Sequence, residues 1–361
     1  MKVAVIFGGK SPEHEVSRVS AVTAVKWLES AGYDVIKIGI TKKGRWYLTD
    51  AGYDEMADGS WEQDPGNLQV VIPHDPEVKG VLVFDRDDRA TVEKVDCFVP
   101  MLHGAHGEDG DIQGLFELAE VPYVGSGVSA SADCMDKSIA KIIAATTGVD
   151  MAKHCVVEKY DYERDPEAAI EWVKDFHRHR FPLFVKPSSA GSSVGASKVK
   201  CPKDLGPAFD EAFRYDDKLL AEEAIVGREF EVAVMGNHEP KASCVGEILS
   251  AGEFYDYESK YVNAESKTRV VDDISKDILD EIREYACAIY KALGCRGLSR
   301  VDFFYSHDDR IVFNEVNTLP GFTSISMYPK LWDHMGVDGP ELMKRLVDLA
   351  IENQEEKHRV Q

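Results

Sequence analysis

The sequence predicts a protein of mixed α/β and α+β class, in which an N-terminal domain with a parallel sheet precedes two further domains. The first third of the chain alternates apolar strand patterns with a helix pattern, which is typical of a parallel sheet covered by helices. Later strands follow one another without a helix between them, as antiparallel neighbours do. With 361 residues, the chain is also longer than one ordinary domain.

The N-terminal domain is expected to span residues 1–133. Its first apolar strand lies at 3–7, a helix follows at about 17–31, and a second strand occupies 35–40. A further buried strand is expected at 97–101. The intervening polar segment shows little periodicity and is expected to form peripheral hairpins and loops at residues 49–94.

Two more domains are expected, at 134–221 and 222–361. The first should contain a helix, a strand, a Gly/Ser loop and a returning antiparallel strand, at 137–147, 181–186, 187–195 and 197–199. The second should contain four strands and one long helix, at 230–235, 243–248, 298–305, 310–316 and 275–293. The charged last nine residues, from Asn353, are expected to fray.

Composition excludes several functional classes. The chain has 42 Lys and Arg against 64 Asp and Glu, a net charge of -22, and no basic cluster, so nucleic-acid binding is disfavoured. Seven scattered cysteines without a Cys-x-x-Cys pair favour reduced thiols over disulfides or zinc.

No apolar run approaches the about 18–20 residues of a membrane span, and the N-terminus lacks the pattern of a signal peptide. A cytoplasmic protein is therefore expected.

Two consecutive strand patterns near residues 298–317 carry a group of polar side chains. Residues two apart on a strand share a face, so Arg300 projects with Asp302, and Glu315 with Asn317. A two-residue turn at Asp308-Asp309 would set Asp302 opposite Glu315. Oxygen ligands of this kind suit Mg²⁺ when phosphates and water complete its shell.

The alternative for this hairpin is a solvated polar face at the edge of a sheet. The opposite face is expected to be apolar and buried, and two aromatic residues on the polar face argue against full solvation. From spacing alone both interpretations stay open. The expected apolar face comprises Val301, Phe303, Ile311 and Val316, and the two aromatics on the polar face are Phe304 and Phe313.

A glycine- and serine-rich loop follows the strand that ends at Lys186. Its sequence, Pro-Ser-Ser-Ala-Gly-Ser-Ser-Val-Gly, covers residues 187–195, and small residues of this kind let backbone N–H groups approach phosphate oxygens. It is not a Walker A loop, which would end in Gly-Lys-Ser/Thr and open a helix. Lys186 and Lys137 could neutralise a phosphate there. A purely structural loop is the alternative.

The His103–Gly114 segment follows a strand of the predicted parallel sheet, at the edge where such sheets bind ligands. His103 and His106 are only three residues apart in a glycine-rich loop, so zinc is disfavoured and a substrate-facing turn with one functional histidine is favoured. Neither a Gly-x-Ser-x-Gly motif nor a Cys/His/Asn set is evident, which disfavours a covalent protein nucleophile.

Together these segments resemble the D-alanine–D-alanine ligase family of the ATP-grasp superfamily, over essentially the whole chain. The motifs that carry the resemblance are His14-Glu15-Val16-Ser17, the His103–Gly114 loop, Pro122–Gly127, Cys134–Lys137, the Lys186–Gly195 loop, Glu222, Gly227–Phe230, Asp256–Tyr261, Arg300–Asp302 and Glu315–Ser326. The resemblance implies an N-terminal α/β domain followed by the two-domain ATP-grasp fold, with ATP held between the last two domains.

The resemblance also implies a nucleotide and metal site. Lys137 and Lys186 would contact phosphates beneath the 187–195 loop, and Lys260 would close over the γ-phosphate from a mobile loop. Asp302, Glu315 and Asn317 would hold two Mg²⁺ ions, or Mn²⁺ in their place. The remaining implied ATP contacts come from Ser193, Glu222, the backbone of Glu223 and Ile225, and Glu229, which meets the ribose.

For the amino-acid substrates, the resemblance implies one set of contacts at each subsite. Glu15 would anchor the first ammonium, His103 would lie near the substrates, and Arg300 with the Gly321 N–H would stabilise the oxyanion. Tyr261 would reach Ser192 and Glu15, which in this family accompanies D-alanine rather than D-lactate. The second carboxylate would be met by Ser326 and Met327, whereas D-serine-using relatives tend to carry a polar or basic residue at the position of Met327.

The implied reaction joins two D-alanine molecules through a D-alanyl phosphate and supplies the peptidoglycan precursor for the cell wall. The resemblance further implies a homodimer through the N-terminal domain.

The alternative functions are a D-alanine–D-lactate or D-alanine–D-serine ligase, or a nucleotide-binding module without catalysis. A carboxylase would need a biotin or bicarbonate segment, and an NAD-dependent oxidoreductase would need a glycine fingerprint. One departure from the family pattern is Asp111, where threonine is more usual.

Overall fold

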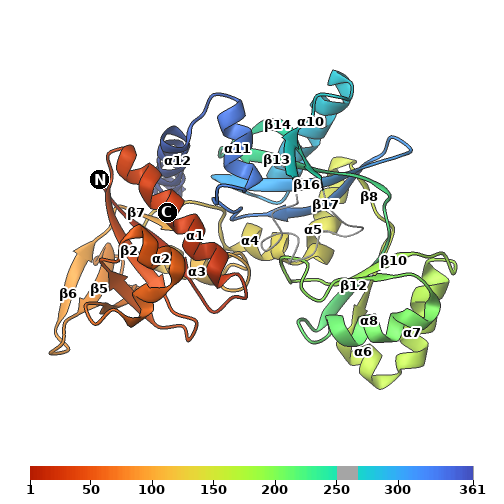
Figure 1. Ribbon diagram of the computed structural model, residues 1–361, viewed down its shortest axis with the longest axis horizontal. Coiled ribbons are helices and arrows are strands. Elements are labelled where there is room, and N and C mark those ends of the chain that lie inside the picture. Colours follow the sequence, from red (N-terminus) through yellow and green to blue (C-terminus); the bar gives the residue numbers. More distant parts are fainter. Residues whose placement is uncertain (250–266, 361) are drawn as a thin grey trace.

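The computed structural model describes residues 1–249 and 267–360, and its strands form three sheets within those ranges (Figure 1). The N-terminal sheet has the order β6-β5-β4-β3-β2-β1-β7. Near one edge of this sheet, β1 (Lys2–Gly8) runs parallel to its neighbours β2 (Asp34–Ile40) and β7 (Cys97–Pro100), as the sequence predicts. The other strands are antiparallel: β3 (Trp46–Thr49), β4 (Leu68–Val71), β5 (Gly80–Phe84) and β6 (Ala90–Lys94).

Both faces of β1 are buried, which explains its uninterrupted apolar sequence. On one face Val5 and Phe7 share a core with α1 (His14–Ser30). On the other face Ile6 belongs to a core in which Phe98 stacks on Phe116 of α3 (Asp111–Ala119), with ring centroids 4.7 Å apart. The segment expected to form only peripheral hairpins thus extends the sheet, and it also contains α2 (Tyr53–Asp58) and the 3₁₀ turn η1 (Ser60–Gln63).

The central sheet is wholly antiparallel, with the order β11-β10-β12-β9. The returning strand expected after the Gly/Ser loop is confirmed, because β10 (Leu183–Pro187) pairs with β11 (Ser197–Val199). Three helices cover this sheet (Figure 1). Its other elements are β9 (His154–Glu158), β12 (Lys218–Glu223), α6 (Lys159–Arg164), α7 (Pro166–Phe176), η3 (Pro202–Asp204) and α8 (Leu205–Ala212).

The third sheet has the order β15-β14-β13-β16-β17-β8. It contains β13 (Gly227–Met235), β14 (Lys241–Leu249), β15 (Lys267–Val270), β16 (Leu298–Ser306) and β17 (Ile311–Asn317), with α10 (Lys276–Ala292) packed against β13, β14 and β16.

An earlier part of the chain also joins this third sheet. The short strand β8 (Asp150–Met151) pairs in parallel with β17, and α4 (Val128–Met135) and α5 (Lys137–Ala144) pack on the same strand. The 3₁₀ turn η2 (Ala145–Thr147) ends at Gly148 in the left-handed region, as expected for a helix C-terminus. The domain limits at 133/134 and 221/222 remain a prediction.

The hairpin of β16 and β17 departs from the predicted turn. The turn is one residue longer than expected, because Ser306 bonds to Arg310 across a left-handed Asp309. A bulge at Asn314 then restores the expected register, so that Asp302 still lies opposite Glu315. The bulge also moves Phe313 from the polar face to the core, where it is fully buried. The expectation that Phe313 lies on the polar face is therefore wrong.

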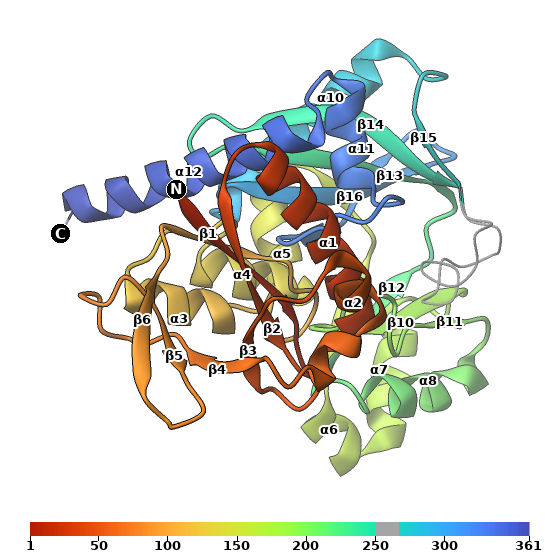
Figure 2. The ribbon, with the colours of Figure 1, turned by 60° about the vertical axis from the view of Figure 1, so that its left-hand side comes forward.

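The N-terminal and third sheets share one apolar core. Helix α1 packs on α12 (Gly339–Val360), and α11 (Met327–His334) completes the contact with β13 and β14 (Figure 2). The chain does not fray from Asn353, because α12 continues to Val360 and its Lys357 pairs with Glu117 of α3. None of the described helices is long and apolar enough to cross a membrane.

Candidate active site

Two adjoining pockets lie where the N-terminal, central and third sheets approach one another. The first, which we call the arginine pocket, is lined by Arg300, Glu13 and His103 among others. The second, the lysine pocket, is lined by Lys137 and Lys186. The two pockets share three lining residues: Ser192, Ile248 and Glu315.

The polar face of the β16–β17 hairpin forms the wall between the pockets. Arg300 donates from Nε and Nη2 to the two carboxylate oxygens of Asp302, at 2.8 and 2.7 Å. Its Nε also lies 3.2 Å from Glu231 Oε1 on the neighbouring β13, and Asn317 Nδ2 donates to Asp302 Oδ2 at 3.0 Å. The convergence of these side chains on one face agrees with the prediction from strand parity. Asp302 is only 3% exposed, so the alternative of a solvated polar face is wrong.

By resemblance Arg300 was assigned to an oxyanion and not to a salt bridge with Asp302, and the absence of that salt bridge is the part that is wrong. Arg300 forms a two-point ion pair with the Asp302 carboxylate, and its oxyanion role stays a prediction. Two opposite charges buried two residues apart on one strand face have little alternative to pairing. Burial alone would lower the pKa of Arg300, but the carboxylates of Asp302 and Glu231 raise it well above its usual value.

The hairpin's donor set fits a hard divalent cation. Asp302, Glu315 and Asn317 offer two carboxylates and one amide oxygen from facing positions on two strands. Lys137 Nζ lies 3.3 Å from Glu315 Oε2, so the same carboxylate reaches the lysine pocket. Oxygen donors in this number leave positions that phosphate and water oxygens can fill.

A glutamate held between two lysines forms the base of the lysine pocket. Lys186 Nζ lies 2.9 Å from Glu222 Oε2, and Lys141 Nζ lies 3.1 Å from Glu222 Oε1. Burial alone would raise the pKa of Glu222, but the two ammonium groups hold it at about 2. Lys186 also donates to Asn314 Oδ1 at 3.2 Å, from the bulge of β17.

The Gly/Ser loop folds over the wall between the pockets. Lys137, the first residue of α5, donates from Nζ to Ala190 O at 2.8 Å, and its N–H donates to Ser188 O at 3.0 Å. Ser192 and Ser193 both adopt left-handed backbone conformations. The Ser192 hydroxyl donates to the Glu13 carboxylate, which joins the loop to the N-terminal domain.

Glu13, rather than Glu15, reaches the arginine pocket. Helix α1 begins at His14, three residues before the predicted start, so Glu13 precedes its first turn and faces the pocket. The Glu15 side chain is 46% exposed and pairs with Lys42. Two acidic residues two apart at a helix start point in different directions, and the sequence alone could not decide between them.

His103 connects the N-terminal domain to the loop after β17. Its Nδ1 donates to Leu319 O at 3.0 Å, and its Nε2 lies 3.0 Å from the Ser20 hydroxyl. Burial lowers the pKa of His103, which favours the neutral form of the ring. It lines the arginine pocket, where the sequence places it by resemblance.

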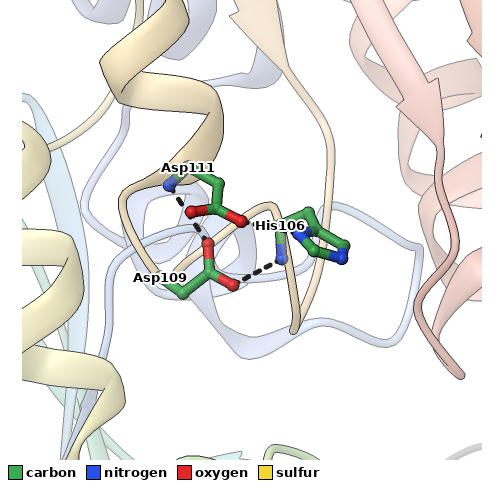
Figure 3. A group of neighbouring side chains, drawn as sticks. All are labelled: His106, Asp109 and Asp111. Carbon is green, nitrogen blue, oxygen red and sulfur yellow. Dashed lines mark hydrogen bonds and ion pairs between the residues drawn. The ribbon is translucent and has the colours of Figure 1, made fainter.

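His106 has different partners, which Figure 3 shows. It is exposed, and its Nδ1 donates to Asp111 Oδ2 at 2.6 Å. Asp109 Oδ2 accepts from the His106 N–H at 2.6 Å, and its Oδ1 accepts from the Asp111 N–H at 3.2 Å. The three side chains thus brace the turn that leads into α3. This contact also accounts for Asp111, which the sequence left unexplained.

Glu108 is a pocket residue that sequence reasoning missed. Its carboxylate accepts from Gly104 N at 2.8 Å and from Leu319 N at 3.2 Å, and it lines the arginine pocket. Burial raises the pKa of Glu108 to about 7, and the nearby Glu13 carboxylate adds to the effect. The only signal in the sequence is an acidic residue inside a glycine-rich loop.

The remaining expected site residues divide between the pockets. Ser326 Oγ accepts from Thr323 N at 3.0 Å, and the Gly321 backbone passes beside it. Lys260 and Tyr261 lie outside the described residues. Gly321, Ser326 and Met327 line the arginine pocket, and Ser193, Glu223, Ile225 and Glu229 line the lysine pocket.

Comparisons with known proteins agree along nearly the whole chain. Models of the D-ala D-ala ligase N-terminus and C-terminus match residues 2–126 and 143–348. The D-alanine–D-alanine ligase of Acetivibrio thermocellus is 44% identical, with 97% of this chain and 96% of the relative covered. That of Geobacillus kaustophilus is 43% identical, covering 99% and 97%.

Solved structures show the same relationship. The D-alanine–D-alanine ligase from Coxiella burnetii superposes with a TM-score of 0.87 at 36% identity, covering 100% of this chain and 96% of that one. The VanG D-Ala:D-Ser ligase from Enterococcus faecalis superposes with a TM-score of 0.85 at 39% identity, covering 97% and 99%. This chain therefore belongs to the D-alanine–D-alanine ligase family and has the ATP-grasp fold of that family.

Proposed function

We propose that this protein is an ATP-dependent, ADP-forming ligase that joins two D-alanine molecules and so supplies the dipeptide precursor of peptidoglycan. One observation carries the proposal. The lysine pocket and the arginine pocket meet at Glu315 and Ser192, so a phosphate held by lysines lies next to a carboxylate-binding guanidinium. The names of the relatives support the choice of D-alanine.

The reaction needs no protein nucleophile. A carboxylate oxygen of the first D-alanine attacks the γ-phosphorus, and the bond to the ADP oxygen breaks. The amino group of the second molecule, once it has lost a proton, attacks the resulting acyl carbon, and phosphate leaves. Lys137 and Lys186 hold phosphate oxygens, while Arg300 and the Gly321 N–H stabilise the oxyanion. Positioning and charge stabilisation account for such a reaction.

Asp302, Glu315 and Asn317 would hold the divalent cations, which we propose to be two Mg²⁺ ions with Mn²⁺ as a substitute. Bound there, the ions would neutralise phosphate charge beside Lys137, whose Nζ lies 3.3 Å from Glu315. Asp302 now shares its oxygens with Arg300, so we expect Arg300 to move towards substrate when a cation binds.

The adenine end of ATP is assigned to the base of the lysine pocket. Glu222 would accept a hydrogen bond from the adenine ring. The backbones of Glu223 and Ile225 would contact the edge of adenine, and Glu229 would contact the ribose. These residues line one pocket with Lys186 and Ser193, which favours one continuous nucleotide site.

The amino-acid subsites are assigned to the arginine pocket. We propose that Glu13, in place of Glu15, binds the first ammonium, because its carboxylate is buried beside Ser192. Ser326 and Met327 would meet the second carboxylate. The proposed contact of Tyr261 with Ser192, and that of Lys260 with the γ-phosphate, remain predictions.

A D-alanine–D-serine ligase is the second candidate, because the likeness to the VanG D-Ala:D-Ser ligase is strong. Met327 favours D-alanine, since a thioether cannot pair with the serine hydroxyl as a polar residue would.

The homodimer and the cytoplasmic location remain part of the proposal, and the dimer can be tested by sedimentation of the purified chain.

The deciding experiment measures phosphate release on adding D-alanine to the protein with Mg-ATP, together with mass spectrometry of the product. We expect release that depends on D-alanine and yields D-alanyl-D-alanine. Release at the same rate without D-alanine, or faster turnover to a D-serine or D-lactate product, would contradict the proposal. The same assay without divalent cation, or with Mn²⁺, tests the metal assignment.

A further inference from the structure

A second lysine behind Glu222 has no part in the mechanism above. Lys141 lies on α5, one turn after Lys137, so the two side chains project from the same side of the helix. Lys137 reaches the Gly/Ser loop, whereas Lys141 reaches inward and places its Nζ 3.1 Å from Glu222 Oε1. Glu222 lines the lysine pocket, with Lys141 behind it. Lys141 therefore acts on a ligand only through Glu222.

The surroundings of Lys141 are unusual for a lysine. The residue is only 1% exposed, and its ammonium lies 5.8 Å from the centre of the Phe313 ring. Within the described part of the chain, Lys141 Nζ and Glu222 Oε1 form an ion pair at 3.1 Å and meet no further hydrogen-bond partner. A buried ion pair without additional hydrogen bonds is costly, and apolar side chains would often stabilise the fold better. Stability alone therefore does not explain this lysine.

Electrostatics offers an explanation. Burial disfavours the ionised form of Glu222, and the ammonium groups of Lys141 and Lys186 reverse that effect. Lys186 is shared with Asn314 and faces the pocket, so Lys141 is the cation dedicated to this carboxylate. Among the described residues, two other charged or titratable side chains are neighbours. Glu315 acts electrostatically on Lys141. His154 on β9 lies opposite Glu222 on β12 in the strand register.

We propose that Lys141 is a positioning residue that keeps Glu222 an acceptor only, and that the lysine pocket thereby selects a nucleobase with an exocyclic amino group over one with a carbonyl at that position. An ionised carboxylate accepts from an amino group and repels a carbonyl oxygen, whereas a protonated carboxyl can donate to that oxygen. The inference rests on the proposed placement of the base beside Glu222.

The test compares ATP with inosine triphosphate, which carries a carbonyl in place of the 6-amino group of adenine. We expect the wild-type kcat/KM to favour ATP by at least about a hundredfold, because a mismatched carbonyl leaves buried polar groups unpaired. Lys141→Met should reduce this ratio at least about tenfold, mostly through KM, with kcat at saturating ATP changed only a few-fold. Lys159→Met is the control for loss of a lysine charge, since Lys159 is half-buried, donates to Phe213 O and lies away from both pockets.

The outcomes separate the possible explanations. A lysine with only a structural role would lower the melting temperature of Lys141→Met while the ATP-to-inosine ratio stays at the wild-type value, and that result would overturn the inference. So would a wild-type protein that uses both nucleotides equally. If Lys141→Met does not fold, Lys141→Gln removes the same charge but keeps a polar group that can donate a hydrogen bond to Glu222. If the wild type shows no ligase activity, the proposed function fails, and calorimetric binding of the two nucleotides still tests the inference.

Discussion

Two glutamates, Glu108 in the arginine pocket and Glu222 in the lysine pocket, behave in opposite ways. Glu108 in the arginine pocket has its pKa raised to about 7 by burial, and the neighbouring Glu13 carboxylate adds to the rise. Burial should act on Glu222 in the same direction, yet Lys141 and Lys186 hold its pKa at about 2. The sign of the nearest charges therefore outweighs burial itself. Several carboxylates line each pocket, and what distinguishes the lysine pocket is the ammonium groups of Lys137 and Lys186.

The largest expected effect concerns the wall between the pockets. Asp302→Asn and Glu315→Gln should each lower kcat at least about a hundredfold, because each removes one charge from the proposed cation site while keeping the shape of the side chain. ADP formation with D-alanine and Mg-ATP measures the loss. Asp308→Asn, in the turn of the same hairpin, should stay within about twofold. If Glu315→Gln and Asp308→Asn have comparable activity, the assignment of Glu315 as a cation ligand is wrong.

A matched pair of glutamates tests the assignment of the arginine pocket. Glu13→Gln should raise the KM for D-alanine by about ten- to a hundredfold, because a buried charge partner of the substrate ammonium is lost. Glu15→Gln should change it less than about twofold, since that side chain is exposed and pairs with Lys42 at the surface. Steady-state kinetics at saturating ATP measures both. The reverse order of effects would restore Glu15 to the site.

The raised pKa of Glu108 has a consequence for stability. An unfolded glutamate ionises near its ordinary pKa, about 4.3, whereas in the folded protein Glu108 ionises near 7. Folding therefore favours the protonated form, and the contribution of Glu108 to stability is lost as the pH rises through this window. The stability of Glu108→Gln relative to wild type should increase by about 1–3 kcal/mol between pH of about 4.5 and 8. Denaturant unfolding at several pH values measures this, and a flat difference would contradict the raised pKa.

Glu222 should show almost no pH dependence over the same window. Its folded pKa of about 2 lies below the unfolded value, so its stabilising contribution is complete above about pH 4.5 and is lost only as the pH falls towards 2. The free-energy difference between wild type and Glu222→Gln should therefore be constant, within about 0.5 kcal/mol, from about pH 5 to 8. If this free-energy difference changes with pH as steeply as the one for Glu108→Gln, the opposite pKa shifts of Glu108 and Glu222 are contradicted.

Local patterns predicted much of the third sheet. The predicted strand register placed Asp302 opposite Glu315, and this pairing is present, with Arg300 opposite Asn317 beside it. The agreement partly rests on compensation, since the turn is one residue longer than predicted and the bulge at Asn314 corrects the register. A bulge depends on packing against the core, so the burial of Phe313 could not be predicted from alternation.

Other parts of the site depend on contacts between distant segments. The Ser192 hydroxyl meets Glu13 across 179 positions of sequence, and this contact identifies which glutamate faces the pocket. The continuation of α12 past Asn353 likewise depends on Lys357 meeting Glu117 on α3. Charge and low hydrophobicity suggest a frayed end, but a partner on another element overrides them.

The sequence by itself determined many of the element types, the shared polar face of β16 and β17 and, through its motifs, the family, because alternation and motif spacing are local properties of the chain. Only the tertiary structure decided in which direction the pKa values of Glu108 and Glu222 shift. Lys141, Lys186 and Glu222 come from α5, β10 and β12, and Glu108, Glu13 and Leu319 from three other segments. The charge of a buried carboxyl depends on what surrounds it in space, and strand alternation carries no information about that.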